Sequence, residues 1–346
     1  MPRLYALAVL FLTCFVLKSH PMRTCWLTFR LALVFPLLLN VFCWPQDSNA
    51  NAPDQTSPSP AQQIDPLLAE GKSLLEKGSL NDAERSVRQF LGQYPMSADA
   101  HYLLGLILFK RAKPKDSLGE YTEGAKYHDP SAYDLEIVAL DYVLLADYAD
   151  ADKWLTESLT RQPKNWEGWY YLGRTKYNEN RFEEAIHAFR ECLKLSPENV
   201  KAEDNLGLSY AGLGQFDDAM AAYRKAIAWQ AQLLIKNLGP YVDMGSLLVD
   251  QNRDEEAIQF LVQATQIAPQ DSKVHQELGR AYEHQNQLAK AQAELEKAAA
   301  LTPDDAALHF VLGKVYRRQG MIDKAKAEFD RSAALRGTHA PRDGTR

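Results

Sequence analysis

The sequence predicts an all-helical chain built from a repeated helix-turn-helix unit. Small residues recur at intervals of about 34 residues, and large apolar residues recur between them at the spacing of helix faces. Prolines close most of the units, as expected of a residue that ends helices and forces the preceding residue into an extended conformation. These two observations favour a linear array of hairpins over a single central core.

The clearest unit spans residues 166–199. Its two halves each carry apolar residues at helical spacing, represented by Leu172 and Phe189. Gly173 and Ala185 are expected where the two helices approach most closely, because small side chains permit the roughly 8–10 Å separation of tight helix packing. The same pattern predicts eight units, at 64–97, 98–131, 132–165, 166–199, 200–233, 238–271, 272–305 and 306–339.

Two places in the unit carry small residues throughout. The eighth place holds Gly71, Gly105, Ala139, Gly173, Gly207, Gly245, Gly279 and Gly313, and the twentieth holds Ala83, Ser117, Ala151, Ala185, Ala219, Ala257, Ala291 and Ala325. Four extra residues, 234–237, follow the fifth unit. Four residues are about one helical turn, so the second helix of that unit is expected to run on and displace the next unit.

Charge and cysteine content narrow the possible functions. The net charge is -6, and residues 1–50 hold four basic residues and one acidic residue, which leaves 35 basic and 44 acidic residues in the remainder. This balance argues against nucleic acid as the main partner, since phosphate binding needs a basic face. Cys192 is the one cysteine outside the first 43 residues. It is expected to be a buried small residue on a second helix rather than a reactive thiol.

Residues 1–50 are predicted to be an export signal or membrane anchor. Read from Met22, basic residues precede a 12-residue apolar run, residues 31–42, and small residues allow cleavage after Ala50. Either Met22 is the true start or the export signal is unusually long. A retained anchor through residues 24–44, with the repeats outside the cytoplasm, is the alternative, and lipid attachment at Cys43 is a further one. The protein is therefore expected to be exported, periplasmic or secreted.

Two segments are predicted to lack a packed fold. Residues 51–63 are rich in Pro, Ser and Gln and are expected to be a disordered linker. Residues 340–346 are expected to be a disordered tail. No further helix follows the eighth unit, so that end of the array is a candidate for self-association.

The repeated residues resemble the tetratricopeptide repeat family, whose 34-residue helix-turn-helix unit has the pattern W, L-G, Y, A, F and P. The resemblance covers Ile64 to about His339 and suggests a bacterial protein of the cell envelope. It implies an α-solenoid, a right-handed superhelix whose first helices line a concave groove. It also implies a protein or peptide partner, with the membrane contacted only through the N-terminal segment.

Carrying over the groove-facing places of the family gives a candidate partner-binding surface. It is apolar and aromatic in units two and three, mixed in unit four and basic in units seven and eight. Its residues are Tyr102, Leu106, Phe109, Tyr133, Leu140, Tyr170, Arg174, Tyr177, Arg280, Lys314 and Arg317, with Lys273, His284 and Arg318 beside the basic end. The competing interpretation is that the apolar residues pack against neighbouring helices and that the basic cluster is solvated surface.

One binding mechanism known in the family is not expected. Co-chaperones of the family clamp a terminal carboxylate with Lys, Asn and Arg residues from three units. Here Arg174 and Asn205 are the nearest matches, but Tyr170 replaces the first Lys, and Gly239 and Asp243 replace the last Lys and Arg.

No catalytic residue, cofactor site or metal site is predicted. His275 and His284 are nine residues apart, which places them on opposite sides of a helix, unlike the i, i+4 spacing of a zinc site. His101, His275 and His309 share the fourth place of their units and are expected to pack. The sequence thus predicts a non-enzymatic scaffold or adaptor in envelope assembly. The alternatives are an accessory subunit of an envelope polysaccharide or lipopolysaccharide enzyme complex, or a hydrolase with an unrecognised site.

Overall fold

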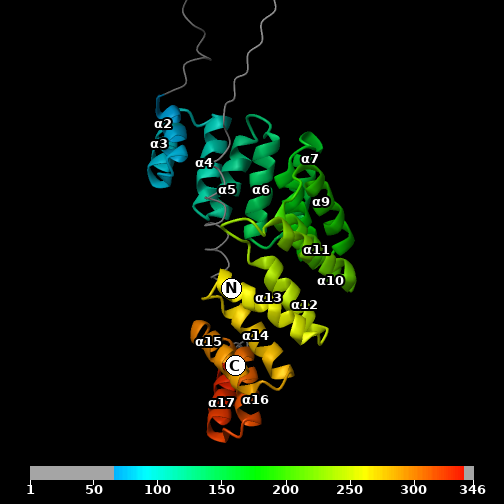
Figure 1. Ribbon diagram of the computed structural model, residues 1–346. Helices are drawn as coiled ribbons and strands as arrows, with labels where there is room; N and C mark the ends of the chain where they lie inside the picture. Colours follow the sequence, from blue (N-terminus) through cyan, green and yellow to red (C-terminus); the bar gives the residue numbers. More distant parts are fainter. Residues whose placement is uncertain (1–65, 339–346) are drawn as a thin grey trace, which may run out of the picture. The chain divides into compact units, whose positions relative to one another are not determined.

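The computed structural model describes residues 66–338, and these form helices without any strand. The helices follow one another as eight hairpins (Figure 1). The predicted leader (1–50), linker (51–63) and tail (340–346) lie outside the described residues.

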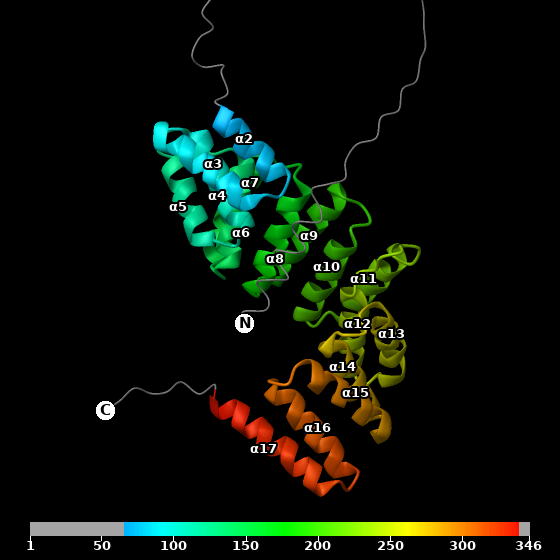
Figure 2. The same ribbon diagram turned by 90° about the vertical axis from the view of Figure 1, so that its left-hand side faces the viewer.

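The chain divides into two compact units, written unit 1 and unit 2 to distinguish them from the 34-residue repeats; unit 1 contains the first two repeats. Unit 1 ends at Tyr127 and unit 2 begins at His128. Unit 1 contains α2 (Pro66–Glu76), α3 (Leu80–Gln93), α4 (Ala98–Lys110) and α5 (Pro114–Gly124). Unit 2 contains α6 (Ala132–Leu144), α7 (Tyr148–Arg161), α8 (Trp166–Asn178), α9 (Phe182–Leu195), α10 (Val200–Gly212), α11 (Phe216–Trp229), α12 (Gly239–Asp250), α13 (Asp254–Ile267), α14 (Ser272–His284), α15 (Leu288–Leu301), α16 (Ala306–Arg318) and α17 (Ile322–Thr338). In Figure 2 the pairs α14/α15 and α16/α17 are seen as successive hairpins.

Local sequence sets where the first helix of most pairs begins. The residue before the helix is Ser, Asn or Asp, and its side-chain oxygen accepts a hydrogen bond from a backbone N–H of the first turn. This cap is present at Ser97, Ser131, Asn165, Asn199, Asp271 and Asp305. The first helix of the sixth pair, α12, follows Leu238 and lacks it.

The glycine at the eighth place makes room for one large side chain of the second helix. A Cβ on Gly173 would lie 2.6 Å from the Phe189 ring, and one on Gly207 would lie 2.5 Å from the Tyr223 ring. The expected close approach is confirmed, but the group that uses the space is the ring at the twenty-fourth place rather than Ala185. In each of these hairpins, an aromatic ring of the second helix packs directly against the glycine of the first helix.

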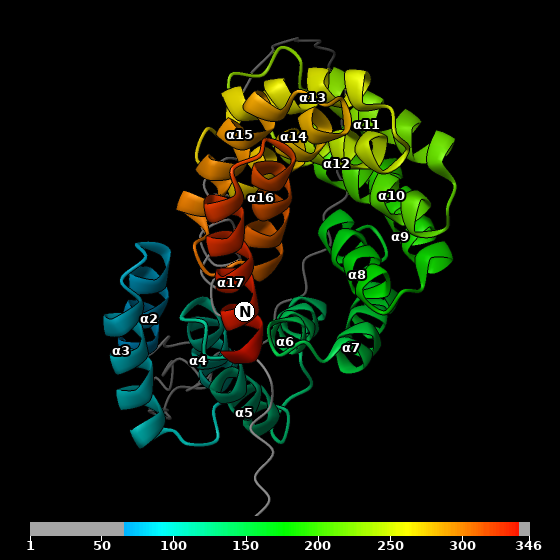
Figure 3. The ribbon, with the colours of Figure 1, turned by 90° about the horizontal axis from the view of Figure 1, so that it is seen from below.

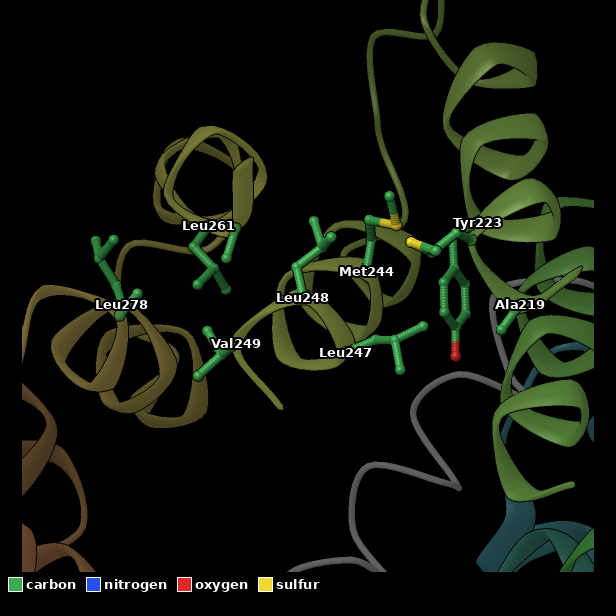
Figure 4. Packing of buried hydrophobic residues seen from close by; sticks show 11 residues of the cluster. Ala219, Tyr223, Met244, Leu247, Leu248, Val249, Leu261 and Leu278 are labelled. Carbon is green, nitrogen blue, oxygen red and sulfur yellow. The ribbon is translucent and has the colours of Figure 1, made fainter. Parts of the chain in front are cut away.

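Buried apolar residues run continuously from pair to pair in unit 2. In the cluster drawn in Figure 4, Tyr223 of α11 reaches toward Met244 and Leu247 of α12, and Leu261 of α13 lies between α12 and Leu278 of α14. Cys192 is also fully buried, and burial raises the pKa of its thiol to about 12. The expectation that Cys192 is a buried small residue is therefore confirmed.

A polar latch at the fourth place of the first helix connects the loop before a pair to both helices of that pair. The Nε2 atoms of His101, His275 and His309 lie 2.9, 3.0 and 2.9 Å from the carbonyl oxygens of Pro95, Pro269 and Pro303. The Nδ1 atom of each ring faces a glutamate of the second helix, at 2.7 Å from Glu120, 2.6 Å from Glu294 and 2.6 Å from Glu328. In the fourth unit, Trp169 donates its indole N–H to the carbonyl of Pro163 at 2.9 Å.

The four extra residues after the fifth unit do not extend its second helix, so that prediction is wrong. Helix α11 ends at Trp229, and a loop leads to α12. The Gln230 side chain closes this loop, because it accepts a hydrogen bond from the Asn237 N–H at 2.6 Å and donates one to the Asn237 carbonyl at 3.0 Å. The loop leaves Leu234 and Ile235 exposed.

Candidate functional site

The first helices of unit 2 line its inner face. Direct contacts join α6 to α8, α8 to α10, α10 to α12 and α12 to α14, whereas each second helix packs mainly against the first helices before and after it. Figure 3 shows α12 and α14 on the inner side of the curve that these helices follow, with α11 and α13 on the outer side. We call the surface shared by α8, α10, α12 and α14 the inner face.

The α8 end of the inner face is aromatic and basic. The Arg174 guanidinium lies 5.9 Å from the centre of the Tyr170 ring, and the Tyr170 and Tyr171 rings meet edge to face at 5.6 Å. Burial raises the pKa of Tyr170, and Arg174 opposes that rise. On α10, burial lowers the pKa of Lys201, and Arg174 lowers it further. This part of the face offers stacking surfaces and two basic groups.

Two carboxyl groups lie at the middle of the inner face, where α10 meets α12. Asp204 is 6% exposed, and its Oδ1 is buried without a hydrogen-bond partner among the described residues. Burial, followed by the charge of Asp243, raises the pKa of Asp204, and Lys273 opposes the rise. Burial also raises the pKa of Asp243 to about 6, again against the effect of Lys273. The two carboxyl groups are therefore desolvated, and Lys273 compensates their charge only in part.

The α14 end carries charges that are already paired. Arg280 donates to Glu277 at 2.7 Å and to Asp250 at 3.0 Å. Across α14 and α16, the Glu283 carboxylate lies 3.6 Å from the Lys314 Nζ and 3.2 Å from an Arg318 nitrogen. The basic cluster predicted in units seven and eight is therefore largely neutralised by neighbouring carboxylates.

The predicted apolar part of the groove is mostly inside the hairpins. Tyr102 and Phe109 of unit 1 are 8% and 6% exposed, and Leu140 of unit 2 is 6% exposed. The Tyr102 ring stacks on Tyr121 at 5.7 Å and lies over Gly124. For these three side chains the competing interpretation, packing against neighbouring helices, describes their surroundings.

The remaining predicted groove residues keep some exposed surface. Tyr133 is 51% exposed, Arg174 and Arg317 are exposed, and the half-buried residues are Leu106, Tyr170, Tyr177, Arg280 and Lys314. The structure brings Tyr170 and Arg174 together on α8. Arg317 lies over the Phe329 ring at 5.6 Å.

The carboxylate pair is not among the site residues predicted from the sequence. Asp204 occupies the fifth place of its unit, the same place as the predicted groove residues Tyr102 and Tyr170. An acid at a place that is apolar or aromatic in five of the eight units is the one signal that the sequence offers. The sequence identifies Asp243 only as a residue that removes the carboxylate clamp, not as half of a pair.

Residues 66–338 contain no grouping of side chains suited to a metal ion. No three His, Cys, Asp or Glu side chains in that range are arranged to hold a metal ion. The fourth-place histidines His101, His275 and His309 are engaged in the latches described for the fold. Of the helices in the same range, none has both the length and the apolar composition needed to cross a bilayer.

Comparison with known families gives a consistent match. Three family models, each described as tetratricopeptide repeat, match residues 68–133, residues 166–199, and overlapping segments from 210 to 341. Together they account for more than half of the chain.

Curated relatives match this chain over only part of their length. The chain is 37% identical to the peroxisomal targeting signal receptor of Saccharomyces cerevisiae over 84 residues, which are 24% of this chain and 13% of that protein. It is 26% identical to protein O-mannosyl-transferase TMTC3 of Homo sapiens over 112 residues, 29% of this chain and 12% of that protein. The matches thus span a quarter or less of each curated relative's length.

A solved structure extends the comparison to three dimensions. A tetratricopeptide repeat protein from Parabacteroides merdae has a TM-score of 0.59 at 18% identity, over 72% of this chain and 96% of its own. At that identity the likeness shows the fold alone.

Proposed function

Because the chain belongs to the tetratricopeptide repeat family, we propose that it is a non-enzymatic scaffold or adaptor that binds an extended segment of a partner protein along the inner face. Proteins of this family mediate protein–protein interaction, and one relative is named a receptor for a targeting signal. The observation that carries the proposal is the gathering of aromatic, basic and acidic groups from four successive first helices on one surface.

The chemistry of the inner face suits a peptide better than a small reactive substrate. Tyr170 can stack on a side chain of the partner, and Arg174 can pair with an acidic one. Asp204 and Asp243 belong to the next two first helices, α10 and α12. A partner that crosses several repeats would contact all of them in turn. Several moderate contacts, rather than one enclosed pocket, would supply its affinity.

Photo-crosslinking from defined positions tests this proposal. A photoreactive amino acid is placed at Arg174 or Lys273 on the inner face, and in separate variants at Lys194 of α9 or Asp218 of α11. All four residues are exposed. We expect one discrete partner to be crosslinked from both inner positions and from neither second-helix position. Equal crosslinking from all four positions would contradict the proposal.

We further propose that the protein works in the cell envelope of a bacterium and takes part in its assembly, after export or anchoring through residues 1–50. The support is the basic and apolar pattern of that segment. Fractionation and N-terminal sequencing of the mature protein test it. A mature chain that begins at Met1 or Pro2 and is found in the cytoplasm would refute it. Self-association through the last repeat stays a prediction, which sedimentation velocity over a range of concentrations would test.

A second candidate function is an accessory subunit of an envelope polysaccharide or lipopolysaccharide enzyme complex. The half-buried aromatic residues Trp169, Tyr170 and Tyr171 of α8 favour it, because aromatic faces commonly stack on sugars. One relative is also named a protein O-mannosyl-transferase. Binding of envelope polysaccharide that is lost in Tyr170→Ala, together with crosslinks to a glycosyltransferase, would favour this alternative.

A further inference from the structure

We propose that Asp204 and Asp243 form a receptor for one basic side chain of the bound segment, arginine in preference to lysine. This inference rests on the proposed function, because it names the chemistry that the inner face recognises in its partner.

The first support is the position of Asp204. Only 6% of the residue is exposed, yet Oδ1 has no hydrogen-bond partner among the described residues. The absent side chain of Gly239 on α12 leaves the space beside the other carboxylate oxygen, since a Cβ at Gly239 would collide with Oδ2. A buried carboxylate normally receives several hydrogen bonds, so this one is short of donors.

The second support is that the negative charge of Asp243 is only weakly compensated by a neighbouring cation. Its side chain is 17% exposed, and the Lys273 Nζ lies 3.9 Å from Oδ1. That separation exceeds hydrogen-bond distance, and the Lys273 side chain is 60% exposed, so the pair contributes little. Near Asp243 on the same helix, Ser246 Oγ is also buried without a partner in the described part of the chain.

The surroundings of the two aspartates indicate which kind of partner group would bind between them. Two carboxylates on adjacent helices present several acceptors and no donor, which matches the planar fork of a guanidinium. The described residues offer no third acidic, histidine or cysteine ligand there, and an all-protein Ca²⁺ site uses about six or more oxygen ligands. A basic side chain from the partner therefore suits the pair better than a metal ion.

Other titratable groups interact electrostatically with the pair. They are Tyr170 and Tyr177 of α8, Tyr223 of α11 and Lys273 of α14. Lys273 is the cation that opposes the rise of both carboxyl pKa values, and it stays outside hydrogen-bond distance of Asp243. The buried Oδ1 of Asp204 therefore still lacks a donor when all of these groups are considered.

Selection from a random heptapeptide library displayed on phage tests the inference with the full chain. The selection is run at pH 7.5 and about 0.15 M salt, where distant surface charges are screened. Four proteins are compared, namely wild type, Asp204→Asn, Asp243→Asn and the control Asp218→Asn, which changes an exposed aspartate of α11. We expect wild type and the control to enrich peptides with arginine at one fixed position.

The two inner-face variants should lose that preference. A peptide selected on wild type should bind each of them at least about tenfold more weakly, while replacement of its arginine by citrulline should weaken binding to wild type but not to the variants. Each variant should also be at least as resistant to urea as wild type at pH 7.5, because the amide removes a buried charge without changing shape. A variant that unfolds more easily would instead show a structural role for the aspartate.

The outcomes separate this inference from the proposed function. Enriched peptides without a basic position, or a basic position that survives in both variants, would overturn the inference and leave peptide binding intact. If no peptide is enriched on wild type, the proposed peptide binding fails and the inference fails with it.

Discussion

Gly105 and Gly119 lie in adjacent helices of unit 1 but have opposite surroundings. A Cβ on Gly105 would lie 2.7 and 2.9 Å from two atoms of the buried Tyr121 ring, whereas a Cβ on Gly119 would meet nothing within 4 Å. We expect Gly105→Ala to lower the free energy of unfolding by about 1–3 kcal/mol through overpacking. Gly119→Ala should raise it by about 0.5–1 kcal/mol through better helix propensity. Urea unfolding followed by circular dichroism measures both, and effects of the same sign would contradict the packing described for the eighth place.

The carboxylate pair should also be visible in the pH dependence of stability. The pKa of Asp243 rises from 3.8 to about 6 on folding, so between these values the folded chain binds more protons than the unfolded chain. Ionisation of this group therefore lowers stability as pH rises through that range. Asp243→Asn should be more stable than wild type at pH 7.5, by at most about 3 kcal/mol, and the difference should vanish near pH 4. A difference that does not depend on pH would show that the effect is not one of ionisation.

The turn between the two helices of each repeat has its own sequence signature, which is separate from the pattern of small and large side chains. The fifteenth place of every unit, in the turn between the two helices, has positive φ, at Gly78, Ala112, Ala146, Asn180, Gly214, Asn252, Asn286 and Gly320. Six of these eight residues are Gly or Asn, the types that tolerate this conformation best. The repeat period follows from side-chain size alone, so the turn residues are a second, independent mark of the same period.

At the scale of elements, the latch at the fourth place holds the loop before a pair against both helices of that pair. The His275 ring bridges the Pro269 carbonyl and Glu294, and it is 4% exposed. His275→Ala should lower the free energy of unfolding by about 1–3 kcal/mol, because it leaves buried polar groups without partners. His275→Trp should recover part of that loss, since Trp169 makes the same bond to Pro163.

The matched control for the latch is His187→Ala on α9. Its side chain is 69% exposed, so its removal should change stability by no more than about 0.5 kcal/mol. Thermal unfolding of the three variants gives the comparison. If His187→Ala were as harmful as His275→Ala, the latch would not be the source of the effect.

The loop between α11 and α12 contradicts the prediction that four extra residues would extend α11 by one turn. The four additional residues equal one turn, but α11 ends before them. Gln230, which is 1% exposed, instead bonds to the backbone of Asn237 and closes the loop. A tertiary hydrogen bond of this kind cannot be seen in helix propensities.

At the scale of the molecule, the main contacts within unit 2 join helices one or two places apart in the chain, so stability should be distributed along the array. Removal of residues 306–346 should leave the remaining helices folded and change the affinity of a selected peptide by less than about twofold, because the inner face ends at α14. Removal of residues 272–346 takes away Lys273 and α14, and should weaken binding clearly. Circular dichroism and calorimetric titration measure the two effects, and equal binding by both truncated chains would place the site nearer to α8.

The fold could be predicted from the sequence because its signals repeat. The small residues at two places recur in all eight units, and each of the predicted units yields a helical pair. The binding surface could not be predicted in the same way, because Tyr102 and Phe109 occupy groove places of the family and are nevertheless buried here. Whether such a side chain faces a partner or a neighbouring helix depends on packing between hairpins, and a single sequence does not record it.

The N-cap, turn residue and latch recur in successive repeats, and this affects how such a chain can gain or lose repeats during evolution. Every one of these features lies within one period or bridges to the period beside it, as at Asn165, Asn180 and Trp169. Duplication of a single period in the gene would therefore create junctions that already fit, and deletion of one would do the same. Growth and shortening by whole periods should be far easier for this lineage than insertion of a few residues inside a helix.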